Sequence, residues 1–202
     1  MLVTDAELTV RARHGDLDAF GALVQRWLPS VYDIVARLVP EQEEADGLTV
    51  DVFANALAQL RGGGQPLPFG LILMEAAYEQ AGRRLASRAR RPVTDELGSS
   101  LEHRVDRRVW HAFLTLDFPA RFALHLHVRH GFTAEQLAGL VDVPRGRAEA
   151  FLAGVVDEFM NPTAPAVADP LVAYAALGNV EVPAGLSAML WRDLQRRWAE
   201  MD

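Results

Sequence analysis

Cysteine and lysine are both absent from the 202 residues of this chain. Without cysteine the chain can form no disulfide and no thiolate metal site, which fits a reducing cytosol. Without lysine every strongly basic side chain is an arginine, which can contact phosphate or guanine through two parallel hydrogen bonds. The longest apolar runs fall far short of the roughly 18 residues that span a membrane, and no basic-then-apolar leader begins the chain. We therefore expect a soluble, cytoplasmic protein without a membrane partner.

Signatures of catalysis are also missing. The triple glycine at residues 62–64 follows no predicted strand and precedes no lysine, so it does not match a phosphate-binding loop, and no nucleophile elbow occurs. His125, His127 and His130 lie close in sequence. On one helix, however, only His127 and His130 share a face, and no acid lies at a matching spacing. The sequence therefore predicts no enzyme, no cofactor and no metal site.

The net charge of −7 is unevenly distributed along the chain. Residues 1–60 hold ten acids and four arginines, whereas residues 61–91 hold six arginines and two acids. Clustered arginines attract polyanions and clustered acids repel them. We therefore expect a nucleic-acid contact within residues 61–91 and a different kind of partner for residues 1–60.

Helical periodicity runs through nearly the whole sequence, because apolar residues recur at intervals of three and four. The best candidate for a linker is residues 92–100, which contain a proline, a glycine and two serines. The sequence predicts an all-α fold with two small helical domains, a short linker between them and a C-terminal extension. The expected limits are 1–91 for the first domain, 92–104 for the linker, 105–161 for the second domain and 162–202 for the extension.

Residues 133–160 have the pattern of two helices joined by a tight corner. Thr133 is a good N-cap with Gln136 at the capping-box spacing, and Pro144 breaks the pattern before a second apolar stripe. This arrangement is typical of a helix-turn-helix, whose second helix can enter a major groove, but an ordinary α-hairpin has the same spacing. Arg145, Arg147 and Glu149 face outward near the start of the second helix. If this unit contacts DNA, we expect contact only through that N-terminal turn, because acids dominate the rest of the outward face.

The helix predicted at residues 69–91 ends in a cluster of arginines. Five of them fall within nine residues without an intervening acid: Arg83, Arg84, Arg88, Arg90 and Arg91. A solvated helix end explains one or two of these cations through the helix dipole. For all five, phosphate contact is the favoured interpretation, because the helix dipole does not stabilise so many cations at one helix end.

Several short motifs occur in a fixed order over most of the chain. They are Asp5-Ala6-Glu7-Leu8 with Gly15-Asp16 and Ala19-Phe20, Pro29-Ser30-Val31-Tyr32 with Ala36-Arg37-Leu38, the acidic stretch from Glu44 to Phe53, the helix from Phe69 to Arg91, and Gly131-Phe132-Thr133 with Leu137-Ala138-Gly139-Leu140. In this order they resemble the extracytoplasmic-function (ECF) branch of the bacterial sigma-70 family. The resemblance implies two helical domains that direct RNA polymerase to promoters.

The resemblance also implies roles for particular residues. Leu48, Asp51, Val52 and Phe53 would bind the β′ clamp of the RNA polymerase core. The arginine cluster would hold the −10 strand, with Phe69 and Tyr78 as candidates for a base pocket. Arg145, Arg147 and Glu149 would read the −35 duplex. The implied partners are the polymerase core and promoter DNA, and an anti-sigma or other regulatory protein is a further candidate.

Two alternatives follow from departures and additions in the sequence. The family's last helix commonly carries cations at the positions that Gly154, Asp157 and Glu158 occupy here. The second hypothesis is therefore a degenerate sigma-fold protein, which binds polymerase or a protein partner without reading promoters. In the extension, apolar residues at helical spacing predict an amphipathic helix: Leu186, Leu190, Leu194, Trp198 and Met201. That helix would pack on its own chain, or serve as a docking helix for a partner or an autoinhibitory clamp.

Overall fold

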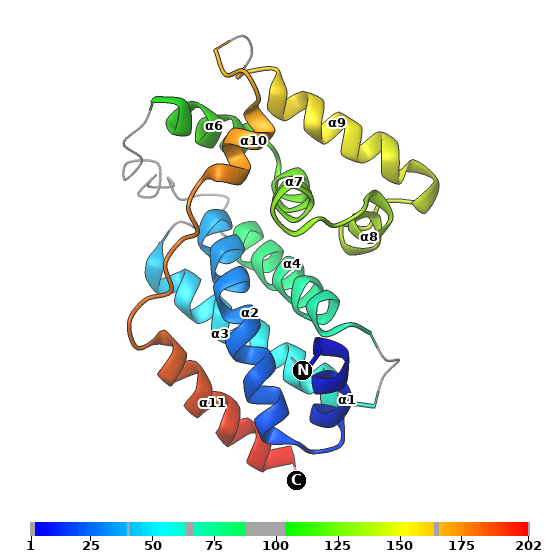
Figure 1. The fold of residues 1–202 in the computed structure, drawn as a ribbon, viewed down its shortest axis with the longest axis vertical. Coiled ribbons are helices and arrows are strands. Elements are labelled where there is room, and N and C mark those ends of the chain that lie inside the picture. The colour runs from blue at the N-terminus through cyan, green and yellow to red at the C-terminus, as the bar shows by residue number, and fades with distance from the viewer. Residues whose placement is uncertain (1–2, 40, 64–66, 88–103, 164–165, 202) are drawn as a thin grey trace. The chain divides into compact units, whose positions relative to one another are not determined.

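The computed structural model describes residues 3–39, 41–63, 67–87, 104–163 and 166–201, and these residues form helices and connecting segments without a strand (Figure 1). The predicted all-α fold is therefore confirmed. The chain divides into two compact units, Met1–Arg90 with Asn179–Asp202, and Arg91–Gly178. Within the described ranges, no helix is both long enough and apolar enough to cross a membrane.

The first unit contains α1 (Asp5–Arg13), α2 (Leu17–Leu38), α3 (Gln42–Arg61), α4 (Phe69–Ser87) and α11 (Leu186–Met201). Local chemistry explains the first boundaries. Thr4 and Glu7 form a reciprocal capping box at the start of α1. Gly15 adopts a φ of 93° between α1 and α2, a conformation that suits glycine, and Asp16 then caps α2.

Helix α2 is the centre of this unit. It continues through Pro29, and its buried residues include Phe20, Val31 and Ile34. Phe20 packs its ring edge-on against Phe69 of α4 at 6.1 Å. Side chains of α3 and α4 complete the buried core between the helices, including Phe53. The long helix thus supplies a rigid base on which α3 and α4 are held.

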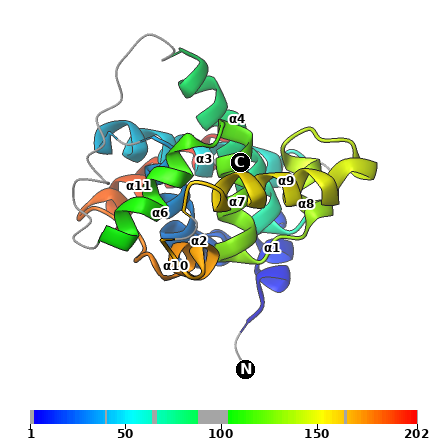
Figure 2. The same ribbon diagram turned by 90° about the horizontal axis from the view of Figure 1, so that it is seen from above.

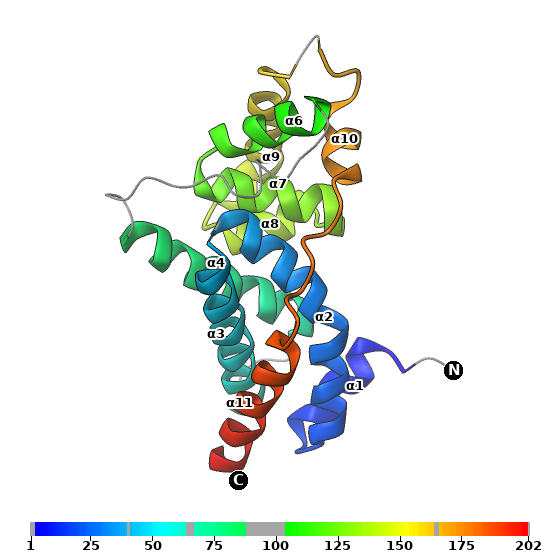
Figure 3. The ribbon, with the colours of Figure 1, turned by 90° about the vertical axis from the view of Figure 1, so that its left-hand side faces the viewer.

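Helix α11 packs beside α2 and α3, although it comes from the end of the chain (Figure 3). Its buried stripe is Leu186, Leu190, Leu194 and Trp198. The Trp198 ring lies 5.5 Å from the ring of Phe20, and the guanidinium of Arg61 lies over the Trp198 ring at 4.8 Å from its centroid. The expectation that the amphipathic helix packs on its own chain is therefore confirmed.

Gly70, in the first turn of α4, lies directly against Trp27 of α2. A Cβ atom placed there would lie 2.4 Å from Cη2 of Trp27. The indole cannot easily retreat, because its Nε1–H donates to Asp5 at 2.8 Å. We expect Gly70→Ala to lower the free energy of unfolding by about 1 to 3 kcal/mol in chemical denaturation.

Gly47 provides the matched control for this prediction. It is also a helical glycine, but a Cβ atom added there would have no neighbour within 4 Å. We expect Gly47→Ala to leave stability unchanged or raise it by up to about 1 kcal/mol. Equal effects of the two substitutions would show that contact with Trp27 does not require glycine at position 70.

The second unit contains α6 (Arg104–Thr115), α7 (Phe118–His130), α8 (Ala134–Leu140), the 3₁₀ turn η1 (Arg145–Arg147), α9 (Ala148–Met160) and α10 (Pro170–Ala176), which can be followed in Figure 2. Its core is aromatic. Phe113 stacks on Trp110 at 5.3 Å and on Tyr174 at 5.0 Å, and Phe159 meets Tyr174 edge-on at 5.7 Å.

Tyr174 of α10 is fully buried, so the second unit continues past the expected limit at residue 161. The expected extension, residues 162–202, is divided instead of forming one segment. Its first part, through Gly178, belongs to the second unit, and the remainder belongs to the first. The expected linker at 92–104 lies almost entirely outside the described residues.

Candidate nucleic-acid interface

Helices α8 and α9 follow each other across a tight corner, an arrangement common to the helix-turn-helix and the α-hairpin. Gln136 N–H donates to the Thr133 hydroxyl at 3.3 Å, and Thr133 N–H donates to the Gln136 side chain at 2.9 Å. This reciprocal pair satisfies two backbone donors that a helix start would otherwise leave without partners. Leu137 and Ala138 of α8 are buried, as are Ala148 and Leu152 of α9. The two helices therefore hold their corner with a shared apolar contact.

The turn between these helices has an unusual backbone. Asp142 adopts a φ of 55°, a left-handed conformation that short polar side chains tolerate. Val143 N–H then donates to the carbonyl of Ala138 at 3.0 Å. Pro144 precedes the short turn η1, and α9 begins only at Ala148. The sequence placed Arg145 and Arg147 in the first turn of the second helix, whereas the structure places them in this 3₁₀ turn.

Arg145 and Arg147 are exposed at the corner, and no ion pair joins either of them to another described residue. Glu149 is exposed immediately after them. Two free guanidinium groups beside a helix N-terminus form a local positive site, because the backbone N–H groups there add partial positive charge. Of the predicted DNA-binding residues, these three lie together on one surface.

The remaining outward face of α9 has the opposite character. Its exposed residues are small or acidic: Ala150, Ala153, Gly154, Asp157 and Glu158. Since nonspecific affinity for DNA comes from arginine and lysine at phosphates, this face offers a duplex nothing to neutralise. Within α8, η1 and α9, the exposed cations therefore lie only at the corner between the helices.

The arginines at the end of α4 have acidic partners that the sequence did not reveal. Arg83 pairs with Glu79 one turn earlier at 3.2 Å, with 66% and 56% of the two side chains exposed. Arg84 pairs with Asp51 of α3 at 3.2 Å, and 43% of the Arg84 side chain is exposed. Exposed pairs of this kind stabilise by less than about 1 kcal/mol, so an incoming phosphate could replace the carboxylate. Arg88, Arg90 and Arg91 lie outside the described residues.

Three of the four predicted polymerase-binding residues lie in the core. Leu48, Val52 and Phe53 are 1%, 0% and 0% exposed. Their side chains are covered by the other helices of this unit, and their role in polymerase binding stays a prediction. The helical spacing of an interface stripe is the same as that of a core stripe, and here the stripe packs inward. Asp51 alone presents its side chain to solvent, and it is the partner of Arg84.

The candidate base pocket is also changed by the packing. Phe69 is 1% exposed and packs against Phe20, so its ring is closed to a base. Tyr78 is partly exposed on α4. Between these two residues, only Tyr78 can present an aromatic face to a nucleic acid.

The histidines of α7 have structural contacts. His125 is fully buried and its Nδ1 lies 3.0 Å from the hydroxyl of Tyr174, while His127 Nδ1 lies 2.9 Å from the carbonyl of Phe132. The ring centroids of His125 and His130 lie 5.4 Å apart, whereas the sequence predicted that His130 shares a helix face with His127. Among the described residues, no three metal-ligating side chains are grouped so that they could hold an ion.

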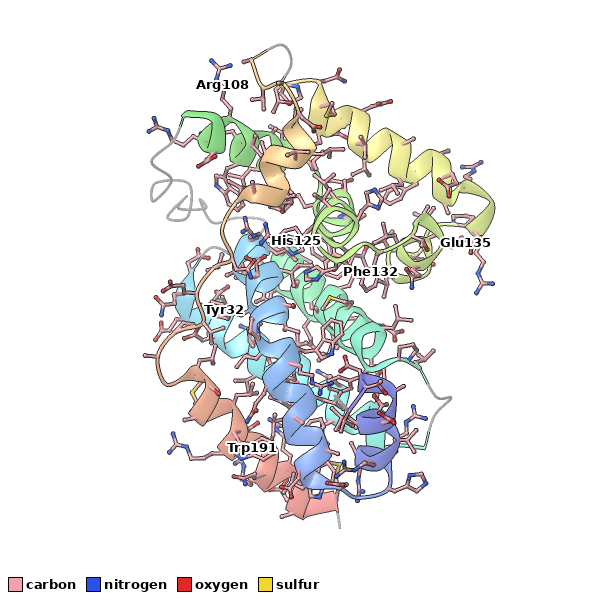
Figure 4. The ribbon with its side chains drawn as sticks, viewed as in Figure 1. Tyr32, Arg108, His125, Phe132, Glu135 and Trp191 are labelled. Atoms are coloured by element: carbon pink, nitrogen blue, oxygen red, sulfur yellow. The ribbon has the colours of Figure 1, made fainter. Side chains whose placement is uncertain are left out.

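Two features were missed by the sequence analysis. Arg107 and Arg108 are exposed on α6, and Figure 4 shows Arg108 projecting outward; no described residue forms an ion pair with either. Residues 92–132 hold five acids and five arginines, so the net charge of this stretch does not indicate a basic surface. The second feature is a buried ion pair, Asp33 with Arg37 at 3.0 Å, whose side chains are each 3% exposed.

No protein-family model matches the chain, and a comparison with curated proteins finds no match. The case for a function therefore depends on the residues and on the geometry of each unit. In the second unit that geometry is a pair of helices with two exposed arginines at their corner that form no ion pair with another described residue. In the first unit it is a helical core with ion-paired arginines on α4.

Proposed function

We propose that this chain is a sigma-like initiation factor of the ECF type, which binds the RNA polymerase core and directs transcription from promoters. The observation that carries the proposal is the α8–η1–α9 corner, with Arg145 and Arg147 exposed and without ion pairs to other described residues at the start of α9. A helix-turn-helix presents this part of its second helix to the edges of bases in the major groove. The order of motifs along the chain supports the same proposal.

Each predicted DNA contact has a physical role in this proposal. Arg145 and Arg147 bind guanine or phosphate of the −35 duplex, and Glu149 accepts from a cytosine amino group. Arg83 and Arg84 exchange their carboxylate partners for phosphates of the −10 strand, which exposed ion pairs allow. Arg88, Arg90 and Arg91 belong to the same cluster in the sequence, outside the described residues.

The polymerase contact is assigned to the outward side of α3. Asp51 supplies a charge there, and Gly47, Val50 and Ala54 are partly exposed on the same helix. Leu48, Val52 and Phe53 hold this surface in place from the core. Because binding energy is concentrated in a few central residues, Asp51 is the first position to test for core binding.

Promoter binding tests the proposal directly. Holoenzyme reconstituted with core polymerase is incubated with a genomic promoter library, and the retained fragments are sequenced and used as probes. We expect Arg145→Ala and Arg147→Ala each to weaken binding to a retained duplex about tenfold, since a good arginine contact contributes about 1 to 3 kcal/mol. The slope of log affinity against log salt should also fall by about one for each arginine–phosphate pair that a substitution removes.

Arg192→Ala is the matched control for these substitutions. Arg192 is exposed on α11 and donates a hydrogen bond to the carbonyl of Ala188, so its replacement removes one cation from a helix of the other unit. We expect it to leave both affinity and salt slope unchanged. If all three variants bind as the unchanged chain does, the corner is not the duplex contact.

The second candidate function is a sigma-fold interaction protein that binds polymerase or a regulatory partner without reading promoters. The acidic outward face of α9 favours it, with Asp157 and Glu158 on the surface that a duplex would approach. The same library decides between the two functions. Core binding without retention of any promoter fragment favours this candidate, and promoter-dependent run-off transcripts favour an initiation factor.

A further inference from the structure

The outward face of α6, in the second unit, is formed by basic side chains. The buried stripe of this helix faces the core and consists of Val109, Trp110, Ala112 and Phe113. At 3.6 residues per turn, Arg107, Arg108 and His111 fall on the opposite side, and all three are exposed. Asp106, the only acid of α6, is directed about 100° away from Arg107. The packing of the apolar stripe therefore presents two arginines and a histidine together to solvent.

The two arginines of this face differ from those of the first unit in having no partner. Each described arginine side chain of the first unit has an interaction partner, in most cases a carboxylate. Arg107 and Arg108 form no ion pair or hydrogen bond with another described residue, and the same is true of Arg145 and Arg147 at the corner. An external anion can therefore bind these guanidinium groups without displacing a carboxylate.

The composition of the face favours phosphate over a protein partner. Protein interfaces concentrate their binding energy in aromatic and aliphatic anchors, and the exposed positions described in α6 hold none: Arg107, Arg108, His111 and Thr115. A phosphate backbone needs only cations and hydrogen-bond donors, and the arginine fork matches two phosphate oxygens. Arg107 and His111 lie one turn apart, about 6 Å along the helix axis, so the basic groups can contact neighbouring phosphates.

The α6 face and the corner between α8 and α9 lie at opposite ends of α9, within the same unit. Arg145 and Arg147 precede the first residue of α9, whereas α6 packs against α9 in the cluster that contains Val155 and Phe159, toward its other end. Figures 1 and 2 show α6 and α8 on opposite sides of this unit. A helix of 13 residues is about 20 Å long, and a major groove is about 12 Å wide. The two cationic surfaces therefore need separate stretches of backbone.

We propose that the outward face of α6, defined by Arg107, Arg108 and His111, is a second nucleic-acid contact, which binds phosphates independently of base sequence. It goes beyond the proposed initiation function, because it needs neither polymerase nor a promoter. Its contribution is electrostatic, since each arginine–phosphate pair releases condensed counterions and binds most strongly at low salt. Together with the corner, it raises the affinity for flanking DNA without changing which sequence is chosen.

Binding of the whole chain to a random-sequence duplex tests this contact without polymerase. Fluorescence anisotropy with a labelled duplex of about 30 base pairs, at roughly 20 to 200 mM salt, gives the affinity and the slope of log affinity against log salt. We expect Arg107→Gln with Arg108→Gln to reduce the slope by about 1.8, or roughly 0.9 for each phosphate contact. The same variant should bind at least about tenfold more weakly at about 50 mM salt.

Two matched variants separate this contact from a general effect of charge. Arg107→Lys with Arg108→Lys retains both charges on the face, so the slope should stay close to that of the unchanged chain. Arg192→Gln with Arg196→Gln removes two exposed cations from α11 in the first unit, and it should change neither slope nor affinity. A slope that falls equally in the α6 and α11 glutamine variants would overturn the contact, as would one that lysine does not preserve.

Further outcomes distinguish the partner and the proposed function. No binding of duplex by the unchanged chain at low salt, or an unchanged slope in the α6 glutamine variant, would overturn the contact. Loss of polyglutamate binding in that variant, with duplex binding retained, would assign the face to an acidic protein instead. Arg145→Gln with Arg147→Gln reports on the corner in the same assay. If only the corner variant changes the slope, the α6 contact fails and the proposed promoter contact stands; if only the α6 variant does, the reverse holds.

Discussion

Replacing Asp33 with alanine is expected to lower the free energy of unfolding by about 3 to 5 kcal/mol. Asp33 and Arg37 form an ion pair on α2 with only 3% of each side chain exposed, and Asp33 also accepts from the N–H of Val180. Removing the carboxylate leaves a buried guanidinium without this counter-charge, which costs far more than the pair itself contributes. Chemical denaturation followed by circular dichroism measures the change.

A double replacement separates the effect of the missing pair from that of the stranded charge. Asp33→Leu with Arg37→Met fills similar volume with apolar groups, and we expect most of the stability to return, since such replacements of buried pairs are often neutral. Asp33→Asn keeps an acceptor for Val180 and should lie between the two. A decrease below about 1 kcal/mol in Asp33→Ala would show that other contacts of Arg37 compensate for the lost carboxylate.

Replacing Tyr174 with alanine is expected to destabilise the second unit by about 3 to 5 kcal/mol, as for other large aromatic residues in a core. The ring is fully buried between Phe113 and Phe159, and its hydroxyl meets His125. The substitution removes the ring packing and the hydroxyl together, and it opens a cavity in the aromatic core. Hydrogen exchange followed by mass spectrometry measures the change separately for each unit.

Two further variants define the cause of this destabilisation. Tyr174→Phe keeps the ring and removes only the hydroxyl, so we expect a decrease of about 1 to 3 kcal/mol from the polar interaction with His125. Val172→Ala changes an exposed residue of the same short helix, 63% exposed, and should stay within about 0.5 kcal/mol of the unchanged chain. Fast exchange in Tyr174→Ala that spreads equally over α1 to α4 would contradict an independent second unit.

The sequence predicted best what depends on neighbouring residues. The capping box at Thr133 and the break at Pro144 are local effects of hydrogen bonding and backbone geometry. The all-α fold followed from the same periodicity. These features need no knowledge of what the helices pack against, which is why they could be read before the fold was known.

Contacts between residues far apart in the sequence could not be predicted in this way. Leu48, Val52 and Phe53 formed an apolar stripe, and a stripe does not reveal whether it faces a core or another protein. The pairing of Arg84 with Asp51 joins residues on different helices. Val180 is 147 residues from Asp33 in the sequence, so neither their hydrogen bond nor the burial of Asp33 could be predicted from spacing.

The position of α11 also affects how the chain is made. The ribosome releases the last helix of the first unit only after the whole second unit, which at about 5 to 20 residues per second means a delay of roughly 4 to 18 s. During that interval α1 to α4 must stay together while the side of α2 that later receives Trp198 is still uncovered. A nascent chain with an exposed apolar strip is a natural client for a chaperone, and binding should end when α11 emerges.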